Sequence, residues 1–149
     1  MTEPNTTIQA YLYQHIPLSE AMQVRVVEVT NDLVILAAPI KPNINHRSTV
    51  FGGSASTLAI LSGWTLINFR LKSENINTRL VIQKNTMNYD QPITNDFQAV
   101  CSITDGQIWQ RFIKTLQRKK KSRITVNSYL QCEGKQVCQF TGVYVALGI

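Results

Sequence analysis

One uncharged stretch constrains this chain more than any other feature. No charged residue lies between Arg47 and Arg70, and a run of that length is long enough to span a bilayer. However, half of the 22 residues from 48 to 69 are Ser, Thr, Gly or Asn, whereas a lipid-facing helix carries more Leu, Ile and Val. The stretch therefore predicts a long helix that is buried inside a soluble domain and is apolar on most faces.

The expected start of this helix carries two adjacent glycines, Gly52 and Gly53. Glycine lets another backbone or a ligand approach closely. At the start of a helix, the first amides are unpaired and the helix dipole is positive, so this position can bind a negative or polarised oxygen. Two interpretations stay open: a glycine turn that allows tight packing, or a binding site for such an oxygen.

Length and cysteine content limit the class of protein. A chain of 149 residues predicts a single domain, residues 1–149. Its first residues lack the basic and apolar regions of a secretory signal. The cysteines are too few and too irregularly spaced for a disulfide framework or a zinc site. We therefore expect buried thiols, no bound metal and a reducing, cytoplasmic location. The three cysteines are Cys101, Cys132 and Cys138.

The net charge of +6 is concentrated in one place. Residues 118–123 hold five cations, and without them the chain has 10 basic and 9 acidic residues. A nucleic-acid-binding domain would spread its basic residues over a face. Little aromatic interleaving surrounds this basic tract, which also disfavours single-stranded nucleic acid. We expect neither nucleic acid nor a membrane as a partner.

The remaining sequence alternates between strand and helix patterns. A short helix is expected over residues 5–15, with Asn5 or Thr6 as its cap, and a one- or two-turn surface helix near residues 108–116. A tight turn at Asn31 and Asp32 and a hairpin turn at Glu133 and Gly134 join strands. The expected strands cover residues 22–29, 33–38, 78–89, 96–104, 123–132 and 136–147.

This order predicts an α+β fold in which one antiparallel sheet wraps around the long buried helix. The two edges of such a sheet carry unpaired backbone groups, and these favour pairing with a second copy of the chain.

Several short motifs carry a family resemblance. They are the 45–53 loop that ends in Phe-Gly-Gly before Ser54, then Gly63-Trp64, then Tyr89 followed by Pro92, and the last strands through residues 140–145. With the order of elements, these motifs resemble the hotdog fold over nearly the whole chain. The pattern is most similar to a thioesterase-like family whose domain also occurs fused to an acetyltransferase domain in some bacterial proteins.

The resemblance implies a homodimer or homotetramer with sheets joined edge to edge, and sites for coenzyme A or acyl-carrier thioesters at the dimer interface. It implies no cofactor. In the better-understood hotdog thioesterases this loop reads Asn, six residues on a His, then Gly-Gly, with an acidic residue nine beyond that His. Asn45 and the two glycines match that pattern. Phe51 replaces the His and Ile60 replaces the acid, so the usual general base or nucleophile is missing.

A mechanism can still be assigned from the resemblance. The Gly53 amide would stabilise the thioester oxyanion, and Asn45 would position the attacking water. Ser54 or Thr57 would hold that water or the substrate. Asp90 is the candidate base, although an Asp before Gln-Pro is also a common turn residue. The residues expected to contact the substrate are Phe51, Gly52, Tyr89, Lys121 and Arg123.

The basic tract has three open interpretations. It is a solvated loop, a nucleic-acid contact, or a site for the coenzyme A phosphates. The last follows from the resemblance, because the fold places Lys121 and Arg123 near the mouth of the site, and arginine offers bidentate phosphate contacts. The leading functional hypothesis is thioester hydrolysis, and the alternative is a non-catalytic acyl-thioester-binding domain. A hydroxyacyl dehydratase ranks below both, because His46 has no acidic partner on the helix.

Overall fold

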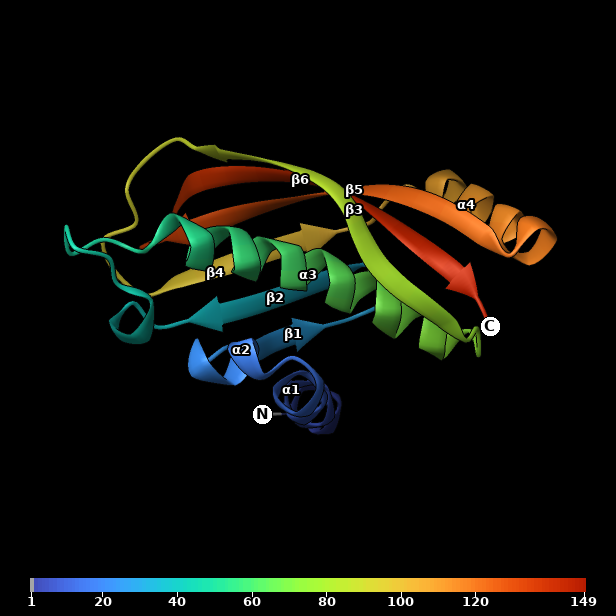
Figure 1. Cartoon of the computed structure of the whole chain (residues 1–149), viewed down its shortest axis with the longest axis horizontal. Coiled ribbons are helices and arrows are strands. Elements are labelled where there is room, and N and C mark those ends of the chain that lie inside the picture. The colour runs from blue at the N-terminus through green and yellow to red at the C-terminus, as the bar shows by residue number, and fades with distance from the viewer. Residues whose placement is uncertain (1) are drawn as a thin grey trace.

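The structure is a computed structural model that describes residues 2–149. A six-stranded antiparallel sheet, in the order β1-β2-β4-β5-β6-β3, curves around the long helix α3 (Figure 1). The predicted α+β arrangement of a sheet around one buried helix is therefore confirmed. The elements are α1 (Glu3–His15), α2 (Pro17–Ala21), β1 (Arg25–Val29), β2 (Leu33–Ala38), η1 (Lys41–Asn43), α3 (Gly52–Ser73), β3 (Thr78–Tyr89), β4 (Phe97–Ser102), α4 (Gly106–Lys119), β5 (Lys121–Cys132) and β6 (Lys135–Gly148).

Small residues let the sheet approach α3 closely. Gly63 faces the ring of Tyr144, and a Cβ atom at this glycine would lie 2.5 Å from the tyrosine hydroxyl. That hydroxyl donates a hydrogen bond to the carbonyl of Ile60 at 2.6 Å. The Ser62 hydroxyl lies 2.9 Å from the Ser128 hydroxyl of β5. Ser62 thus joins α3 to β5 through its hydroxyl. Within residues 2–149 no helix has the length and apolarity to cross a membrane.

The hairpin between β5 and β6 follows from its turn residues. Glu133 and Gly134 have φ angles of 51° and 77°, as the two central residues of a type I′ turn require. The turn and the two strands on either side of it were predicted from the sequence, and both are confirmed.

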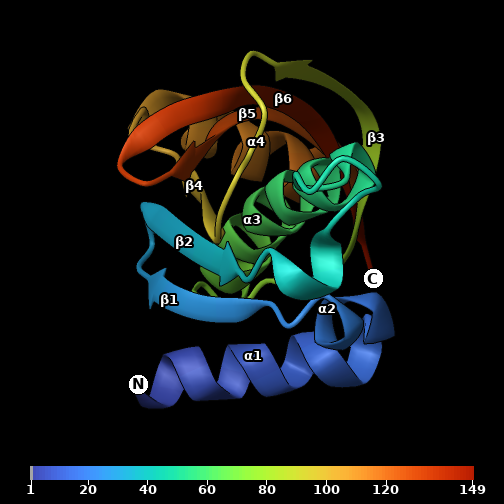
Figure 2. The same ribbon diagram turned by 90° about the vertical axis from the view of Figure 1, so that its left-hand side faces the viewer.

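The two edges of the sheet differ. Helix α1 runs beside the β1 edge (Figure 2), where the Asn5 side-chain amide donates to the carbonyl of Val27 at 3.0 Å. At the other edge, β3 pairs with β6 on one side and presents its second side over 12 residues. Within residues 2–149 nothing pairs with that side. β3 is therefore the open edge of the sheet.

The structure near the N-terminus differs from three predictions. Helix α1 begins at Glu3 and is capped by Thr2, whose side chain accepts from the Asn5 backbone amide, so neither Asn5 nor Thr6 is the cap. Pro4 fits the first turn of a helix, where its missing N–H costs no bond. The short helix α2 was not predicted. β1 begins at Arg25 rather than at residue 22.

Helix α4 is longer than expected, with 14 residues instead of one or two turns. The Asp105 side chain caps it by accepting from the Gln107 amide at 2.9 Å. Arg118 and Lys119 form its last turn, where cations suit the negative end of the helix dipole. Lys120 ends the helix in the left-handed region, with φ of 60°. The basic tract is therefore a helix end followed by a strand start, not a loop.

Candidate functional site

The start of α3 has hydrogen-bond donors that folding does not use. Phe51 is the N-cap residue and its side chain makes no capping bond. Its carbonyl accepts from the Ser54 amide at 2.9 Å and from the Ala55 amide at 3.1 Å. Within the described chain, the amides of Gly52 and Gly53 have no hydrogen-bond partner. Two backbone donors are thus available at the positive end of the helix dipole.

Two aromatic side chains flank these donors. Phe51 is 58% exposed and Tyr89 is 54% exposed, and the Tyr89 hydroxyl donates to the carbonyl of Gly52 at 3.2 Å. A Cβ atom on Gly53 would lie 2.3 Å from the Phe51 ring, whereas one on Gly52 would lie 3.5 Å from the Tyr89 ring. Gly53 is therefore needed for the Phe51 ring to lie against the helix start. Exposed aromatic rings beside unused donors suit a ligand with an apolar part and a carbonyl.

Asn45 shapes the loop that leads into α3. Its Oδ1 accepts from the amides of Arg47 at 2.8 Å and Thr49 at 3.1 Å. Its Nδ2 donates to the Thr49 hydroxyl at 2.9 Å and to the Val50 carbonyl at 3.4 Å. These four bonds use the full capacity of the amide. The role of Asn45 in positioning a water stays a prediction, and it would require one of these bonds to open.

Sequence reasoning missed Asn43, which fixes the same loop to the rest of the domain. Its side chain is 2% exposed, and its Nδ2 donates to the carbonyls of Met22 at 3.0 Å and Pro39 at 2.8 Å. Its backbone carbonyl accepts from the Phe51 amide at 2.8 Å. The neighbouring Pro42 marks a turn in the sequence but does not indicate which groups the turn connects.

The two hydroxyls in the first turns of α3 differ in availability. The Thr57 hydroxyl donates to the Gly53 carbonyl at 2.8 Å, so it can only accept a further hydrogen bond. Ser54 is half-buried, and its hydroxyl makes no hydrogen bond to another residue of the 2–149 range. Of the two, Ser54 is the one that could donate to a substrate or hold a water.

Asp90, the candidate base, is bonded to a residue of β6. Its carboxylate accepts from the Gln139 side chain at 3.3 Å. Gln139 is exposed, whereas its neighbours Cys138 and Phe140 are buried, so Gln139 points to the face of the sheet away from α3. The Asp90 carboxylate is thus held on the side of Gln139 in this structure, and its expected role as the base stays a prediction.

Lys121 and Arg123 also lie away from the helix start within one copy. Through the ladder, Arg123 aligns with Val145 of β6 and then with Val81 of β3. Eight residues separate Val81 from Tyr89, which is about 26 Å along a strand. The Arg123 Nε donates to Gln83 at 2.8 Å. Within one copy these two cations therefore do not border the helix start, and their place at the mouth of a site between two copies stays a prediction.

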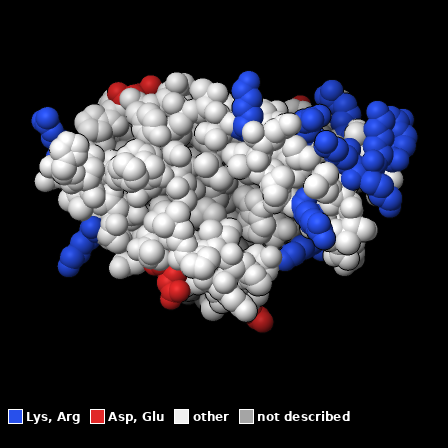
Figure 3. Space-filling view, in the orientation of Figure 1, with Lys and Arg blue, Asp and Glu red and all other residues white. Residues whose placement is uncertain are grey.

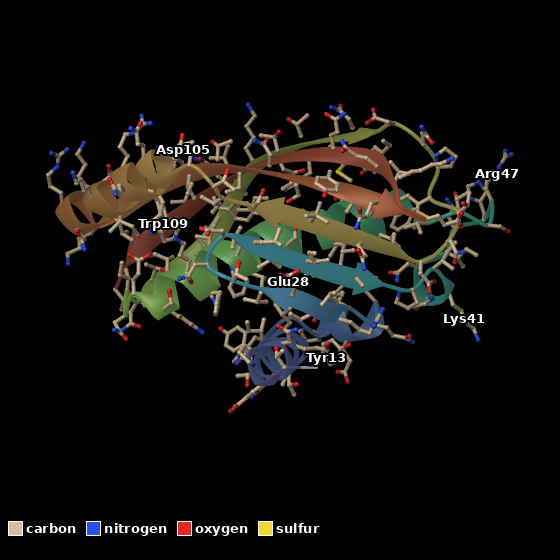
Figure 4. All side chains as sticks on the ribbon, turned by 180° about the vertical axis from the view of Figure 1, so that it is seen from behind. Tyr13, Glu28, Lys41, Arg47, Asp105 and Trp109 are labelled. Carbon is tan, nitrogen blue, oxygen red and sulfur yellow. The ribbon has the colours of Figure 1, made fainter. Side chains whose placement is uncertain are left out.

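The figures show the same separation. Lys and Arg side chains gather at the end of the molecule that α4 occupies (Figure 3). Arg47, in the loop before α3, lies at the opposite end from Trp109 of α4 (Figure 4).

The first turns of α3 carry no charged side chain. No ionisable residue occurs in α3 before Arg70. The main cavities of residues 2–149 are lined by other parts of the chain. In the same range, no three His, Cys, Asp or Glu side chains group closely enough to hold a metal. The groups at this helix start that can stabilise a negative or polarised oxygen are the two backbone amides.

Comparison with known proteins identifies the family. The model of the family described as "Putative thioesterase (yiiD_Cterm)" matches residues 5–148. A crystal structure described as a "putative thioesterase" from Shewanella oneidensis is 28% identical, with 99% of each chain covered and a TM-score of 0.88. A protein of unknown function from Chlorobaculum tepidum TLS is 27% identical, with 97% of this chain and 94% of that chain covered and a TM-score of 0.92. The family model spans nearly the whole chain, and the sheet around α3 is the hotdog fold of these neighbours; this chain belongs to that hotdog-fold thioesterase family.

Proposed function

We propose that the protein hydrolyses acyl thioesters of coenzyme A or an acyl carrier protein at the start of α3. The observation that carries the proposal is the pair of unused amides at Gly52 and Gly53. The thioester carbonyl oxygen accepts from the Gly53 amide, and the Gly52 amide and the two aromatic rings hold the substrate. One such donor is worth about 3 kcal/mol in the transition state of acyl transfer.

The reaction itself needs one water. Its oxygen attacks the carbonyl carbon, and the carbonyl electrons move onto the oxygen that faces the Gly53 amide. Collapse of this tetrahedral oxyanion breaks the carbon–sulfur bond. The proton lost by the water ends on the leaving thiolate, so the products are a carboxylic acid and a free thiol. A thiol has a pKa of about 8.5, which makes its thiolate a good leaving group. The hydroxyl of Ser54 orients the water.

A homodimer belongs to the same proposal. The open side of β3 is 12 residues long, and Val81 on this strand is 52% exposed. Antiparallel pairing of two β3 strands over their full length sets the Thr78 end of one copy beside the Tyr89 end of the other. The basic end of one copy then approaches the helix start of its partner. Lys121 and Arg123 would in this way reach the phosphates of coenzyme A bound there.

A reducing, cytoplasmic location is also part of the proposal. It is supported by the three cysteines, which are free and buried. Extracellular domains more often use their cysteines in disulfides.

A second candidate is supported by the same surface. Phe51 and Ile60 leave α3 without a His or an acid in its first turns, and Asp90 faces away. A site with donors and no base binds a thioester without hydrolysing it. The protein would then be a non-catalytic acyl-thioester-binding domain.

Two substitutions at Gly53 test the first proposal. Both Gly53→Pro and Gly53→Ala add a Cβ atom that displaces the Phe51 ring, but only proline removes the amide hydrogen. Proline is tolerated in the first helical turn, and the same chain already carries Pro4 there in α1. With a thiol-detecting dye and a panel of acyl-coenzyme A esters, we expect the proline variant to turn over about 100-fold more slowly than the alanine variant.

Equal turnover of the two variants would remove the Gly53 amide from the mechanism. Saturable binding of the esters by the wild-type protein, without release of thiol, would instead support the binding domain.

A further inference from the structure

A cavity with mostly apolar walls lies away from the helix start. It has a volume of about 490 Å³ and lies between α1 and the second half of α3. Ligand pockets typically have volumes of about 300–1,000 Å³ and mostly apolar walls. Ile8 and Tyr11 of α1 form one wall, and Trp64 and Phe69 of α3 form the other. The rings of Tyr11 and Trp64 stack with their centroids 6.2 Å apart.

The charged groups of this cavity are at its rim. Glu3 and Lys72 are both exposed, and the Lys72 ammonium lies 4.3 Å from the centroid of the Tyr11 ring. A long lysine side chain can cover apolar surface while its charge stays in water. The interior of the cavity can therefore bind an apolar chain, while the charged groups at its rim face solvent.

A half-buried side of α3 runs from the glycine start to this cavity. Four residues of this side are half-buried: Thr57, Ile60, Trp64 and Asn68. All other residues between 57 and 68 are buried. Their spacing of three or four residues puts the four side chains on one side of the helix. Gly53 lies on the same side, one turn before Thr57. Trp64 belongs both to this side and to the cavity wall.

The length of this path sets a chain length. Eleven residues separate Gly53 from Trp64 and sixteen separate it from Phe69, which correspond to about 16 Å and 24 Å along a helix. An extended chain advances about 1.2 Å per bond. A thioester carbonyl at Gly53 would therefore need about 14 to 20 carbons for its far end to fill the cavity.

We infer that the substrate carries a long, unbranched acyl chain, whose far end occupies the cavity between α1 and α3. This inference rests on the proposed function, because it takes the Gly53 amide as the position of the carbonyl. The chain lies along the half-buried side of α3 that carries Thr57 and Ile60, passes Trp64 and ends among Ile8, Tyr11 and Phe69. An acyl group of eight carbons stops short of the cavity and gains nothing from it.

A matched pair of variants on α1 tests the inference. Thr7 is exposed and lines the cavity, whereas its neighbour Thr6 is exposed and does not. Thr7→Phe places a ring in the cavity, and Thr6→Phe adds the same ring outside it. With palmitoyl-coenzyme A, we expect kcat/KM to fall at least tenfold in Thr7→Phe and to stay within twofold of wild type in Thr6→Phe. With octanoyl-coenzyme A, both variants stay within twofold.

The same two esters separate failure of the inference from failure of the proposed function. If the wild-type protein hydrolyses both esters and the two variants behave alike, the cavity does not hold the chain. The same flat result is expected if a second copy of the protein fills the cavity.

A binding measurement covers the case in which no ester is hydrolysed. Trp64 lines the cavity, while the other tryptophan, Trp109, is 3% exposed and bonded to Glu74. Palmitate should change the fluorescence of the wild-type protein saturably, and the change should be lost in Trp64→Phe and weakened at least tenfold in affinity in Thr7→Phe. Equal responses to palmitate and octanoate, or no response, would overturn the inference.

Discussion

The two ends of α3 use their polar groups in opposite ways. At the C-terminal end, the Glu74 amide is bonded to the carbonyls of Arg70 and Leu71. The Arg70 guanidinium lies 3.4 Å from the Asp32 carboxylate and 4.5 Å from the centroid of the Trp109 ring. The Trp109 indole donates to the Glu74 carboxylate at 2.7 Å. This end joins α3, α4 and the β1–β2 turn.

At the N-terminal end, the amides of Gly52 and Gly53 are unpaired within the described chain, and Phe51 is exposed. The closed end holds the elements together, whereas the open end leaves two backbone donors without a partner in the described chain. Changes at the closed end should lower the free energy of unfolding, and changes at the open end should mainly lower turnover.

Trp109→Ala should have the largest effect, a loss of about 3–5 kcal/mol in the free energy of unfolding. It removes a buried ring, the contact with Arg70 and the bond to Glu74. Urea unfolding measures the loss, and Trp109→Phe, which keeps most of the packing, should lose less. The kcat of the folded fraction should stay within twofold of wild type. A parallel fall of stability and kcat would show that the two ends are not independent.

The free energy of unfolding should fall at high pH, because a buried thiol lies beneath the middle of α3. Burial raises the pKa of the Cys101 thiol to about 11, and the hydroxyls of Ser128 and Ser62 lower it in part. The folded pKa is above the unfolded value of 9.0, so this stabilisation is full below pH 9 and is lost as the pH rises through 11. By linkage, the loss at pH 11 is about 2 kcal/mol.

Urea unfolding at pH 8 and at pH 11 measures this loss. Cys101→Ala should show a decline that is smaller by the same amount, because it lacks the buried thiol. An identical decline in the two proteins would contradict the prediction.

Asn45→Ala should lower turnover at least tenfold, because the loop before the open end loses the four bonds of this side chain. A thiol-release assay measures the change. Asn127→Ala is the matched control, because Asn127 is an exposed asparagine of β5 that accepts from Thr141, and its turnover should stay at the wild-type level. If Asn45→Ala turns over normally, Asn45 has no part in the reaction.

The smallest effect is expected for Lys121→Ala combined with Arg123→Ala. The affinity for coenzyme A should fall about three- to fivefold, since exposed charge contacts are worth about 0.2–1 kcal/mol each. The effect should shrink at high salt. The control is Lys41→Ala with Arg47→Ala, two exposed cations near the helix start of the same copy. If coenzyme A binding is insensitive to salt and unchanged in the Lys121/Arg123 double variant, these two residues do not bind the phosphates. If affinity falls only in the Lys41/Arg47 double variant, the phosphates are bound by the 41–47 loop.

Features that depend on local chemistry were predictable from the sequence. β2 and β3 have the predicted bounds, because alternation and turn residues act over a few positions. The Glu133–Gly134 turn was predictable for the same reason. Helix α4 was underestimated, because a run of Lys and Arg resembles a solvated loop until its place at a helix end is known.

The geometry of the site was less predictable, because it depends on pairing between distant segments. The register between β5, β6 and β3 puts Arg123 beside Gln83 instead of beside Tyr89. The bond from Gln139 turns Asp90 away from α3. The sequence indicated Asn45 as a candidate site residue, but only the folded loop shows that all of its hydrogen-bonding capacity is used.

The absence of a capping side chain on Phe51 has a consequence for how such proteins diversify. A cap made by Ser or Asp would tie the first turn to the stability of the whole domain, and any replacement there would be costly. With an aromatic residue in that place, the first turn of α3 does not depend on the side chain at position 51 for a capping bond. A histidine at position 51 would place a proton acceptor beside the two free amides and leave the fold unchanged.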